Sequence, residues 1–358
     1  MIQVRAIITE EMKRAVMDTL DGDFHPGGAQ CRRFEDEFAE YCGAKYAVCV
    51  SSGSAALHLA TIACGIGPSD EVITASNSMS SSADCILHVG ATPIFVEIER
   101  ETHNMDPGSV ERNITRRTRA IIPVHMYGHP ADMDAILDIA KRHGLAVIED
   151  ACLSAGAKCK GHRLGIFGDA TCFSFVSKNM TVAGDGGMVT TNDERVADTV
   201  RMLRLHGRDR EGKQKILGFN YRMSEISATI GRLQLKKLDE WNEKRRSYAR
   251  TYSDLLKDAC LDLPIEKEWA FHVYLHYMTG CNRRDHLRSL LEKKGIRTRI
   301  PYPPIHLLPY VAERFGLKEG MLPITEGHWR RGIALPTYPS LSEAKIHEIA
   351  ENVRDALK

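Results

Sequence analysis

Short apolar runs alternate with amphipathic stretches through the first two thirds of the chain. The runs lie at residues 46–50, 71–76, 91–98, 119–126, 145–150, 170–176 and 187–191. Runs of this kind, without a regular polar alternation, are typical of strands covered on both faces, as in parallel sheets. Parallel neighbours need crossover connections, which the intervening helical segments can supply. The pattern therefore predicts an α/β fold with a mostly parallel sheet.

Helical spacing is clearest in four segments. Residues 131–144 have apolar positions at helical spacing and end in a His-Gly pair, which is a helix-stop signal. Residues 231–259 are long, charged and helical in period, so we expect one long helix that bridges two domains. Further helices are expected at 285–295 and 342–358. We predict a large domain over 1–235 and a smaller α+β domain over 236–358, with the N-terminal segment as a candidate to pack on the small domain.

The composition excludes several classes of protein. The 358 residues are 43% hydrophobic and 27% charged, which is the balance of a soluble globular protein. The 48 basic and 47 acidic side chains give a net charge of +1, without the basic excess of a general nucleic-acid surface. The N-terminus lacks a signal-peptide core and no run approaches membrane-spanning length. We expect a cytoplasmic protein that binds neither nucleic acid nor membrane.

The ten cysteines include no CxxC pair. Several stand inside apolar runs, so we interpret them as buried, reduced thiols of a cytosolic protein. His125 and His129 have a spacing that a metal could use on a helix, but they follow a predicted strand, and we predict no metal site.

Three strand ends carry candidate chemistry, because ligands of open α/β sheets bind at the carboxyl ends of the strands. In VSSGSAALHLA (50–60), a turn with Gly53 and neighbouring serines leads into a helix, whose start can hold a phosphate. A plain serine N-cap is the alternative for this segment alone. In LAVIED (145–150), one of Glu149 and Asp150 should face the opposite side from the other. Such an acid can pair with a protonated ring nitrogen, or it can simply cap the next segment or be solvated.

The third strand end is FSFVSKNMTVAGDGGM (173–188), where Lys178 follows an apolar run and precedes a glycine-rich turn. A desolvated lysine has a lowered pKa and can form a Schiff base, although an exposed loop lysine is the alternative. A phosphate cup, an acid for a pyridinium nitrogen and a Schiff-base lysine, in that order, together predict a pyridoxal 5'-phosphate (PLP) site.

The chain resembles the DegT/StrS-type sugar aminotransferases, of the fold type I aspartate aminotransferase superfamily. The matching segments include SSGSAALHLA, GATPIFVEIERETHNMDP, AIIPVHMYGHPADMDAI, GLAVIEDA and GFNYRMSEISATIGRLQLKKLDEW. The resemblance implies a mostly parallel, seven-stranded-type sheet sandwiched by helices, and a homodimer with shared active sites. It also implies amino transfer from glutamate or glutamine to a keto sugar, most often one linked to a nucleotide.

Functional residues are carried over by position. Lys178 resembles the lysine that binds the cofactor covalently, and Asp150 resembles the acid that faces the pyridine nitrogen. Asn220 matches an asparagine that reaches the phosphate from the neighbouring subunit. The other cofactor-binding positions are Gly53, Ser54, Ala55, Met79 and Ser174. His125, Tyr302 and His306 are candidate substrate residues.

The chain departs from the family at four places. Met79 stands where an aromatic ring usually stacks on the cofactor, and Leu153 where Gln or His lies near the ring hydroxyl. SFVSK is one residue shorter than the usual SFxxxK, and Pro301 replaces a common histidine, which suggests an altered substrate pocket. Two alternatives therefore accompany the aminotransferase prediction. One is a PLP-dependent sugar dehydratase, although relatives of that kind carry histidine where this chain has Lys178. The other, for which Met79, Leu153 and the shortened SFVSK segment are the motives, is a catalytically weak cofactor-binding or regulatory protein.

Overall fold

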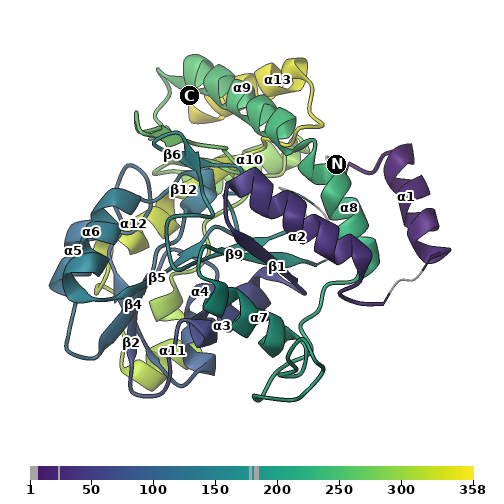
Figure 1. The fold of residues 1–358 in the computed structure, drawn as a ribbon. Helices are drawn as coiled ribbons and strands as arrows, with labels where there is room; N and C mark the ends of the chain where they lie inside the picture. The colour runs from purple at the N-terminus through teal and green to yellow at the C-terminus, as the bar shows by residue number, and fades with distance from the viewer. Residues whose placement is uncertain (1–6, 23–24, 177–179, 181–184) are drawn as a thin grey trace.

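A seven-stranded sheet forms the centre of the molecule (Figure 1). The computed structural model describes residues 7–22, 25–176, 180 and 185–358. The strand order is β1-β9-β8-β5-β4-β2-β3, and β9 runs antiparallel to both of its neighbours while the other pairs are parallel. The strands of this sheet are β1 (Tyr46–Val50), β2 (Glu71–Ala75), β3 (Thr92–Val96), β4 (Thr118–Ile122), β5 (Ala146–Asp150), β8 (Ala170–Ser174) and β9 (Gly187–Thr191). The predicted α/β fold with a mostly parallel sheet is confirmed.

Helices cover the sheet, and α9, α10 and α13 gather at the top of Figure 1. The helices are α1 (Glu10–Leu20), α2 (Ala29–Cys42), α3 (Gly53–Ala63), α4 (Ser81–His88), α5 (Pro107–Arg112), α6 (Met133–His143), α7 (Glu194–Arg204), α8 (Glu225–Leu235), α9 (Leu238–Leu256), α10 (Arg284–Lys293), α11 (Pro309–Phe315), α12 (Pro323–Arg331) and α13 (Glu343–Leu357). The short strands are β6 (Lys158–Cys159), β7 (His162–Arg163), β10 (Ala270–Phe271), β11 (Tyr277–Gly280) and β12 (Gly332–Leu335). Within the described ranges, every helix is too short or too polar to span a bilayer.

The prediction of one long helix over 231–259 is wrong, because the structure divides this segment between α8 and α9. The two helices pack on different parts of the molecule. Helix α8 lies against α1 and α2, where Arg232 bonds Glu37, whereas α9 lies against α13. The break at Lys236 and Lys237 lets each apolar face reach its own partner.

Separate apolar cores accompany this division. Two cores flank the central sheet, and a third is built by α9, α10, α13, β11 and β12 from residues between Tyr248 and Val353. The boundary at 235/236 between two domains stays a prediction. All ten cysteines carry free thiols, and seven of them are buried.

Candidate active site

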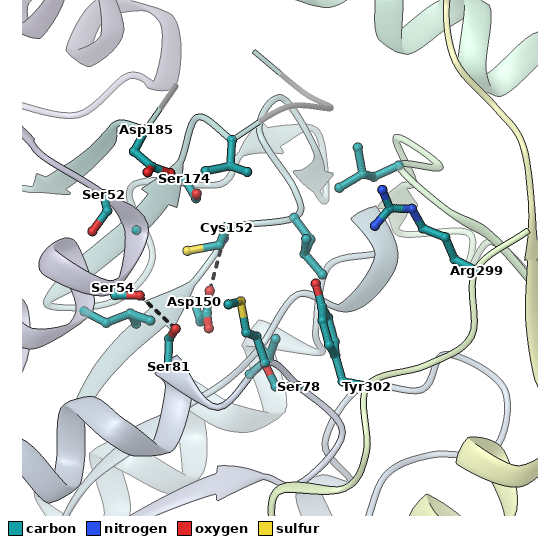
Figure 2. Close-up of a pocket in the computed structure, with 17 residues that line it drawn as sticks. Ser52, Ser54, Ser78, Ser81, Asp150, Cys152, Ser174, Asp185, Arg299 and Tyr302 are labelled. Atoms are coloured by element: carbon teal, nitrogen blue, oxygen red, sulfur yellow. Dashed lines mark hydrogen bonds between the residues drawn. The ribbon is translucent and has the colours of Figure 1, made fainter. Parts of the chain in front are cut away.

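A pocket of about 310 Å³ opens at the carboxyl ends of the central parallel strands (Figure 2). Its walls come from segments that are far apart in the sequence. The lining residues are Ser52, Gly53, Ser54, Leu57, Ser78, Met79, Ser81, Val124, Asp150, Cys152, Leu153, Ser174, Val176, Asp185, Leu275, Arg299 and Tyr302. Of the residues predicted for the site, the structure therefore brings together Gly53, Ser54, Met79, Asp150, Ser174 and Tyr302.

Hydroxyl groups surround the N-terminus of α3 at one end of this pocket. Ser52 caps the helix, and its Oγ accepts a hydrogen bond of 3.1 Å from the N–H of Ala55. The Oγ atoms of Ser54 and Ser81 lie 2.8 Å apart. The first N–H groups of a helix have no partner within the helix and carry its positive dipole end. These donors are suited to an anion, and no arginine or lysine stands among the described lining residues at this end, where the Asp185 carboxylate also lies.

Gly53 is required at this position by the close approach of other side chains. A Cβ atom on Gly53 would lie 2.7 Å from Cβ of Ser174 and 2.9 Å from Sγ of Cys152. Ala55, by contrast, is 5% exposed and is not a lining residue, and its N–H donates to Ser52 Oγ. The role of Ala55 in cofactor binding stays a prediction, and in this structure its N–H serves the helix cap.

Asp150 lies at the end of β5 and presents its carboxylate to the middle of the pocket (Figure 2). Its Oδ2 accepts a hydrogen bond of 2.6 Å from Ser82 Oγ, and its Oδ1 accepts one of 3.1 Å from the N–H of Cys152. Ser82 is fully buried, and its Oγ lies 2.7 Å from that of Ser78. These hydroxyls hold the carboxylate in one orientation, while the pocket leaves space on its open side.

Glu149 faces the opposite side of the sheet, as the alternation along a strand requires. It is fully buried, and its carboxylate accepts hydrogen bonds from Gly168 N at 2.8 Å and Thr171 Oγ1 at 2.6 Å. Nε2 of His125 lies 3.0 Å from the same carboxylate, and Nδ1 of His125 accepts from the N–H of Ala131. Both ring nitrogens of His125 are therefore engaged inside the core, and its assignment as a substrate residue stays a prediction.

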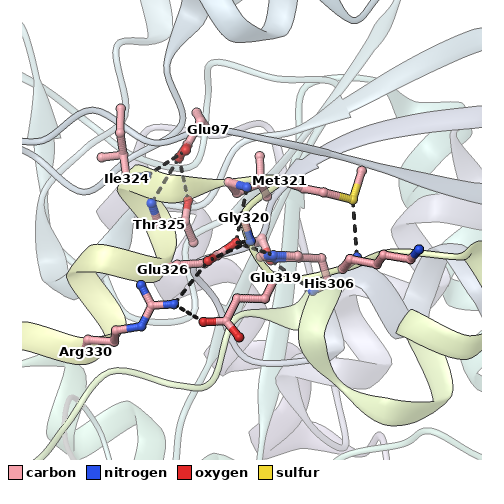
Figure 3. A network of polar contacts seen from close by, with 12 residues as sticks. Glu97, His306, Glu319, Gly320, Met321, Ile324, Thr325, Glu326 and Arg330 are labelled. Atoms are coloured by element: carbon pink, nitrogen blue, oxygen red, sulfur yellow. Dashed lines mark hydrogen bonds and ion pairs between the residues drawn. The ribbon is translucent and has the colours of Figure 1, made fainter.

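His306 is also placed away from the pocket (Figure 3). Its Nδ1 lies 2.8 Å from Ser76 Oγ and its Nε2 lies 3.2 Å from Glu326 Oε1. Glu326 in turn accepts hydrogen bonds from the N–H groups of Gly320 and Leu322. This buried network ties α12 to the loop that follows β2, and the substrate role of His306 likewise stays a prediction.

The remaining predicted residues divide into four cases. Leu153 and Met79 line the pocket, and Met79 is 55% exposed, so both departures from the family pattern lie at the site. Pro301 is buried near Gly332 and is not a lining residue, and the altered substrate pocket expected from it stays a prediction. Asn220 is exposed outside this pocket, where its Oδ1 accepts from Arg222. Lys178 lies outside the described residues.

Sequence reasoning missed Ser78, Ser81, Ser82 and Arg299. The serines stand in SNSMSSSAD directly after β2, so a run of hydroxyls at a strand end was the available signal. Arg299 stands two residues before Pro301 in a segment of irregular structure, where no periodicity indicates which way a side chain points.

Comparison with known proteins decides the family. The sequence model of the DegT/DnrJ/EryC1/StrS aminotransferase family matches residues 6–354. The chain belongs to this family. The family membership, the fold class and the aminotransferase class predicted from the sequence are thereby confirmed.

Three similar proteins illustrate the range of this aminotransferase family. A "Pleiotropic regulatory protein" of Geobacillus stearothermophilus is 40% identical over 97% of this chain and 95% of its own. The dTDP-3-amino-3,4,6-trideoxy-alpha-D-glucose transaminase of Streptomyces venezuelae is 40% identical over 96% of this chain and 92% of its own. The crystal structure of S. venezuelae DesV in complex with a ketimine intermediate superposes with a TM-score of 0.94, at 39% identity, covering 97% of this chain and 95% of DesV.

Proposed function

We propose that this protein is a PLP-dependent aminotransferase that moves an amino group from glutamate, or glutamine, to a nucleotide-linked keto sugar. One observation carries the proposal: in a chain of an aminotransferase family, the buried Asp150 carboxylate opens onto a pocket whose end is lined by hydroxyls and a helix N-terminus. PLP is the cofactor of this family, in agreement with the prediction from the sequence.

The lining residues fit the cofactor in three parts. The α3 N-terminus with Ser54, Ser81 and Ser174 would hold the phosphate, because helix N–H groups and hydroxyls bind a dianion without a cation. Asp150 would face the ring nitrogen. Leu153 and Met79 would lie near the ring, where the thioether of Met79 can make a polarizable contact. Leu153 offers no hydrogen bond to the ring hydroxyl, so that contact is absent from this site.

The residues of the chain have separate tasks in the reaction. PLP, when bound, supplies an electron-accepting ring. Asp150, held by Ser82 Oγ and the Cys152 N–H, would keep a proton on the ring nitrogen of the bound cofactor. Lys178 would bind the cofactor covalently and then move a proton from the α-carbon of the amino donor. We further propose a cytoplasmic homodimer in which Asn220 of the partner subunit reaches the phosphate.

Absorption spectroscopy of the purified protein with PLP tests this proposal. We expect a visible band that disappears on addition of L-glutamate, with one equivalent of 2-oxoglutarate formed per site, and recovery of the band with an accepted keto sugar. The Lys178→Ala variant should lack both the band and turnover. A panel of UDP-, GDP- and dTDP-linked keto sugars would then identify the acceptor.

The alternatives give different outcomes of the same experiment. Release of ammonia in place of 2-oxoglutarate would indicate a dehydratase. A protein that binds PLP but is inert to amino acids would indicate the regulatory alternative. Full turnover by Lys178→Ala would contradict the aminotransferase mechanism itself.

A further inference from the structure

The two ends of the pocket differ in charge. Serine hydroxyls and Asp185 lie at one end, whereas Arg299 and Tyr302 lie at the other, with Asp150 between them (Figure 2). Arg299 is the one arginine or lysine among the described lining residues. A cation at this place lies away from the hydroxyl-lined end that fits the cofactor phosphate, so it can bind a ligand other than the cofactor.

The main chain of Arg299 is held firmly in place. Its N–H donates to the carbonyl oxygen of Ala334 at 3.2 Å, and the N–H of Ala334 donates back to the carbonyl oxygen of Arg299 at 2.7 Å. These bonds attach residue 299 to β12, which pairs with β11. The guanidinium therefore extends from a fixed point on the sheet toward the pocket.

Among the described residues, no carboxylate lies within ion-pair distance of Arg299, whereas Arg284, Arg330 and Arg331 each have such a partner. Its neighbours are phenols instead. Tyr302 and Tyr338 are half-buried, and burial raises the pKa of both hydroxyls although the Arg299 cation opposes this. Both phenols therefore stay neutral, and the positive charge faces the pocket uncompensated.

We propose that Arg299 is an anion-binding residue that recognises an oxyanion of the substrate, either a carboxylate of the amino donor or a phosphate of the nucleotide-linked acceptor. A guanidinium binds either group through two parallel N–H···O bonds, and the phenols can add a further donor. This inference rests on the proposed function, because it assigns the end of the pocket that the cofactor leaves open. It makes Arg299 a specificity-determining residue of the reaction.

Spectral titration of the PLP-loaded protein separates the two sources. In the donor arm, L-glutamate is titrated against the visible band of wild type, Arg299→Gln and Arg299→Lys. In the acceptor arm, binding of UDP, GDP and dTDP is measured by calorimetry. We expect Arg299→Gln to weaken one arm about 10-fold or more and Arg299→Lys to weaken it less, since loss of a charged hydrogen-bonded pair has this size. Which arm changes identifies the oxyanion.

Controls keep this result specific. The dissociation constant of PLP should stay within about twofold in every variant, since Arg299 lies away from the hydroxyl-lined end. Arg116→Gln removes an equally exposed arginine that does not line the pocket and should change neither arm. If Arg299→Gln leaves both arms within about twofold of wild type, the proposal is overturned. If wild type is inert to glutamate, the proposed function fails, and the nucleotide arm still decides the role of Arg299.

Discussion

Glu149 and Asp150 are neighbours at the end of one strand, yet they serve opposite purposes. Glu149 is fully buried and its carboxylate is used by donors from His125, Gly168 and Thr171. Among the described residues, Asp150 accepts from the Ser82 hydroxyl and the Cys152 N–H alone, and its remaining side faces the pocket. Burial of an acid is therefore not in itself a sign of function. The functional acid is distinguished by carboxylate oxygens that can still accept hydrogen bonds from a group in the pocket.

The largest predicted effect follows from substitution of Asp150, which lies on the side of the sheet that faces the pocket, here called the open side. Asp150→Asn preserves shape but removes the charge that would keep a proton on the ring nitrogen. We expect the rate of the glutamate half-reaction to fall about 1000-fold, within the range for a lost proton-holding group. Stopped-flow absorbance measures this rate, and urea unfolding of the same sample should show little change in stability. A half-reaction within about threefold of wild type would remove Asp150 from the mechanism.

Glu149 lies on the side of the sheet where the carboxylate is fully engaged, which we call the closed side. Substitution there should lower stability and leave the reaction rate nearly unchanged. Glu149→Gln leaves buried donors of His125, Gly168 and Thr171 with a single amide oxygen in place of a carboxylate. We expect the free energy of unfolding to fall by about 2 kcal/mol, from the value of hydrogen bonds to a buried charged acceptor. Urea denaturation measures the loss.

A double-mutant cycle with His125→Asn gives the control for the closed side. The two substitutions should be strongly non-additive, because each removes the same contact. The folded Glu149→Gln protein should keep its half-reaction rate within about threefold. If that rate fell as far as in Asp150→Asn while stability was unchanged, the division of labour between the two acids would be wrong.

A smaller effect is expected from the hydroxyls that orient Asp150. Ser82→Ala removes the 2.6 Å bond to Oδ2, whereas Ser78→Ala removes only the hydroxyl behind it. We expect the half-reaction to slow about 10-fold in Ser82→Ala and less in Ser78→Ala, from the value of a hydrogen bond to a charged group. The pH dependence of the visible band should also shift in Ser82→Ala. Equal effects of the two substitutions would argue against a role of Ser82 in holding Asp150.

Features that depend on neighbouring residues in the sequence could be predicted, whereas features that depend on contacts between distant segments could not. The strands and the placement of Asp150 and Gly53 at strand ends follow from local pattern and from the order of the motifs. Because successive side chains of a strand point to opposite faces, the sequence also predicts that Glu149 and Asp150 lie on opposite sides of the sheet. The hydroxyl donor of Asp150, in contrast, is Ser82 in α4, the helix after β2, and β4 separates β2 from β5 in the sheet. Local sequence therefore could not indicate this contact.

The features that local sequence could not decide have a common physical cause. His125 and His306 are polar residues near strand ends, and nothing local distinguishes a ring that faces a pocket from one whose nitrogens are satisfied in the core. The break between α8 and α9 likewise depends on the different surfaces on which the two helices pack. Tertiary partners decide each of these features.

The smallest predicted effect concerns pH, and it also tests the closed side. His129 lies in the same loop as His125, is 2% exposed, and its Nδ1 lies 2.7 Å from the carbonyl oxygen of Pro130. Burial lowers the pKa of His129 from 6.5 to about 4. The unfolded chain therefore binds a proton at a higher pH than the folded protein does. The free energy of unfolding should fall as the pH drops from about 6.5 toward 4, and this histidine should contribute about 1–2 kcal/mol of that loss at pH 5.

Urea unfolding at pH 7 and pH 5 measures this contribution as a difference between proteins. His129→Asn should be less stable than wild type at pH 7, because it leaves a gap and loses the Nδ1 contact. Its further loss between pH 7 and pH 5 should be smaller than that of wild type, since one histidine that must stay neutral has been removed. Identical losses in the two proteins would mean that His129 takes up its proton equally well in the folded state. The closed side would then be open to water at that point, and the contrast with the Asp150 side would have to be given up.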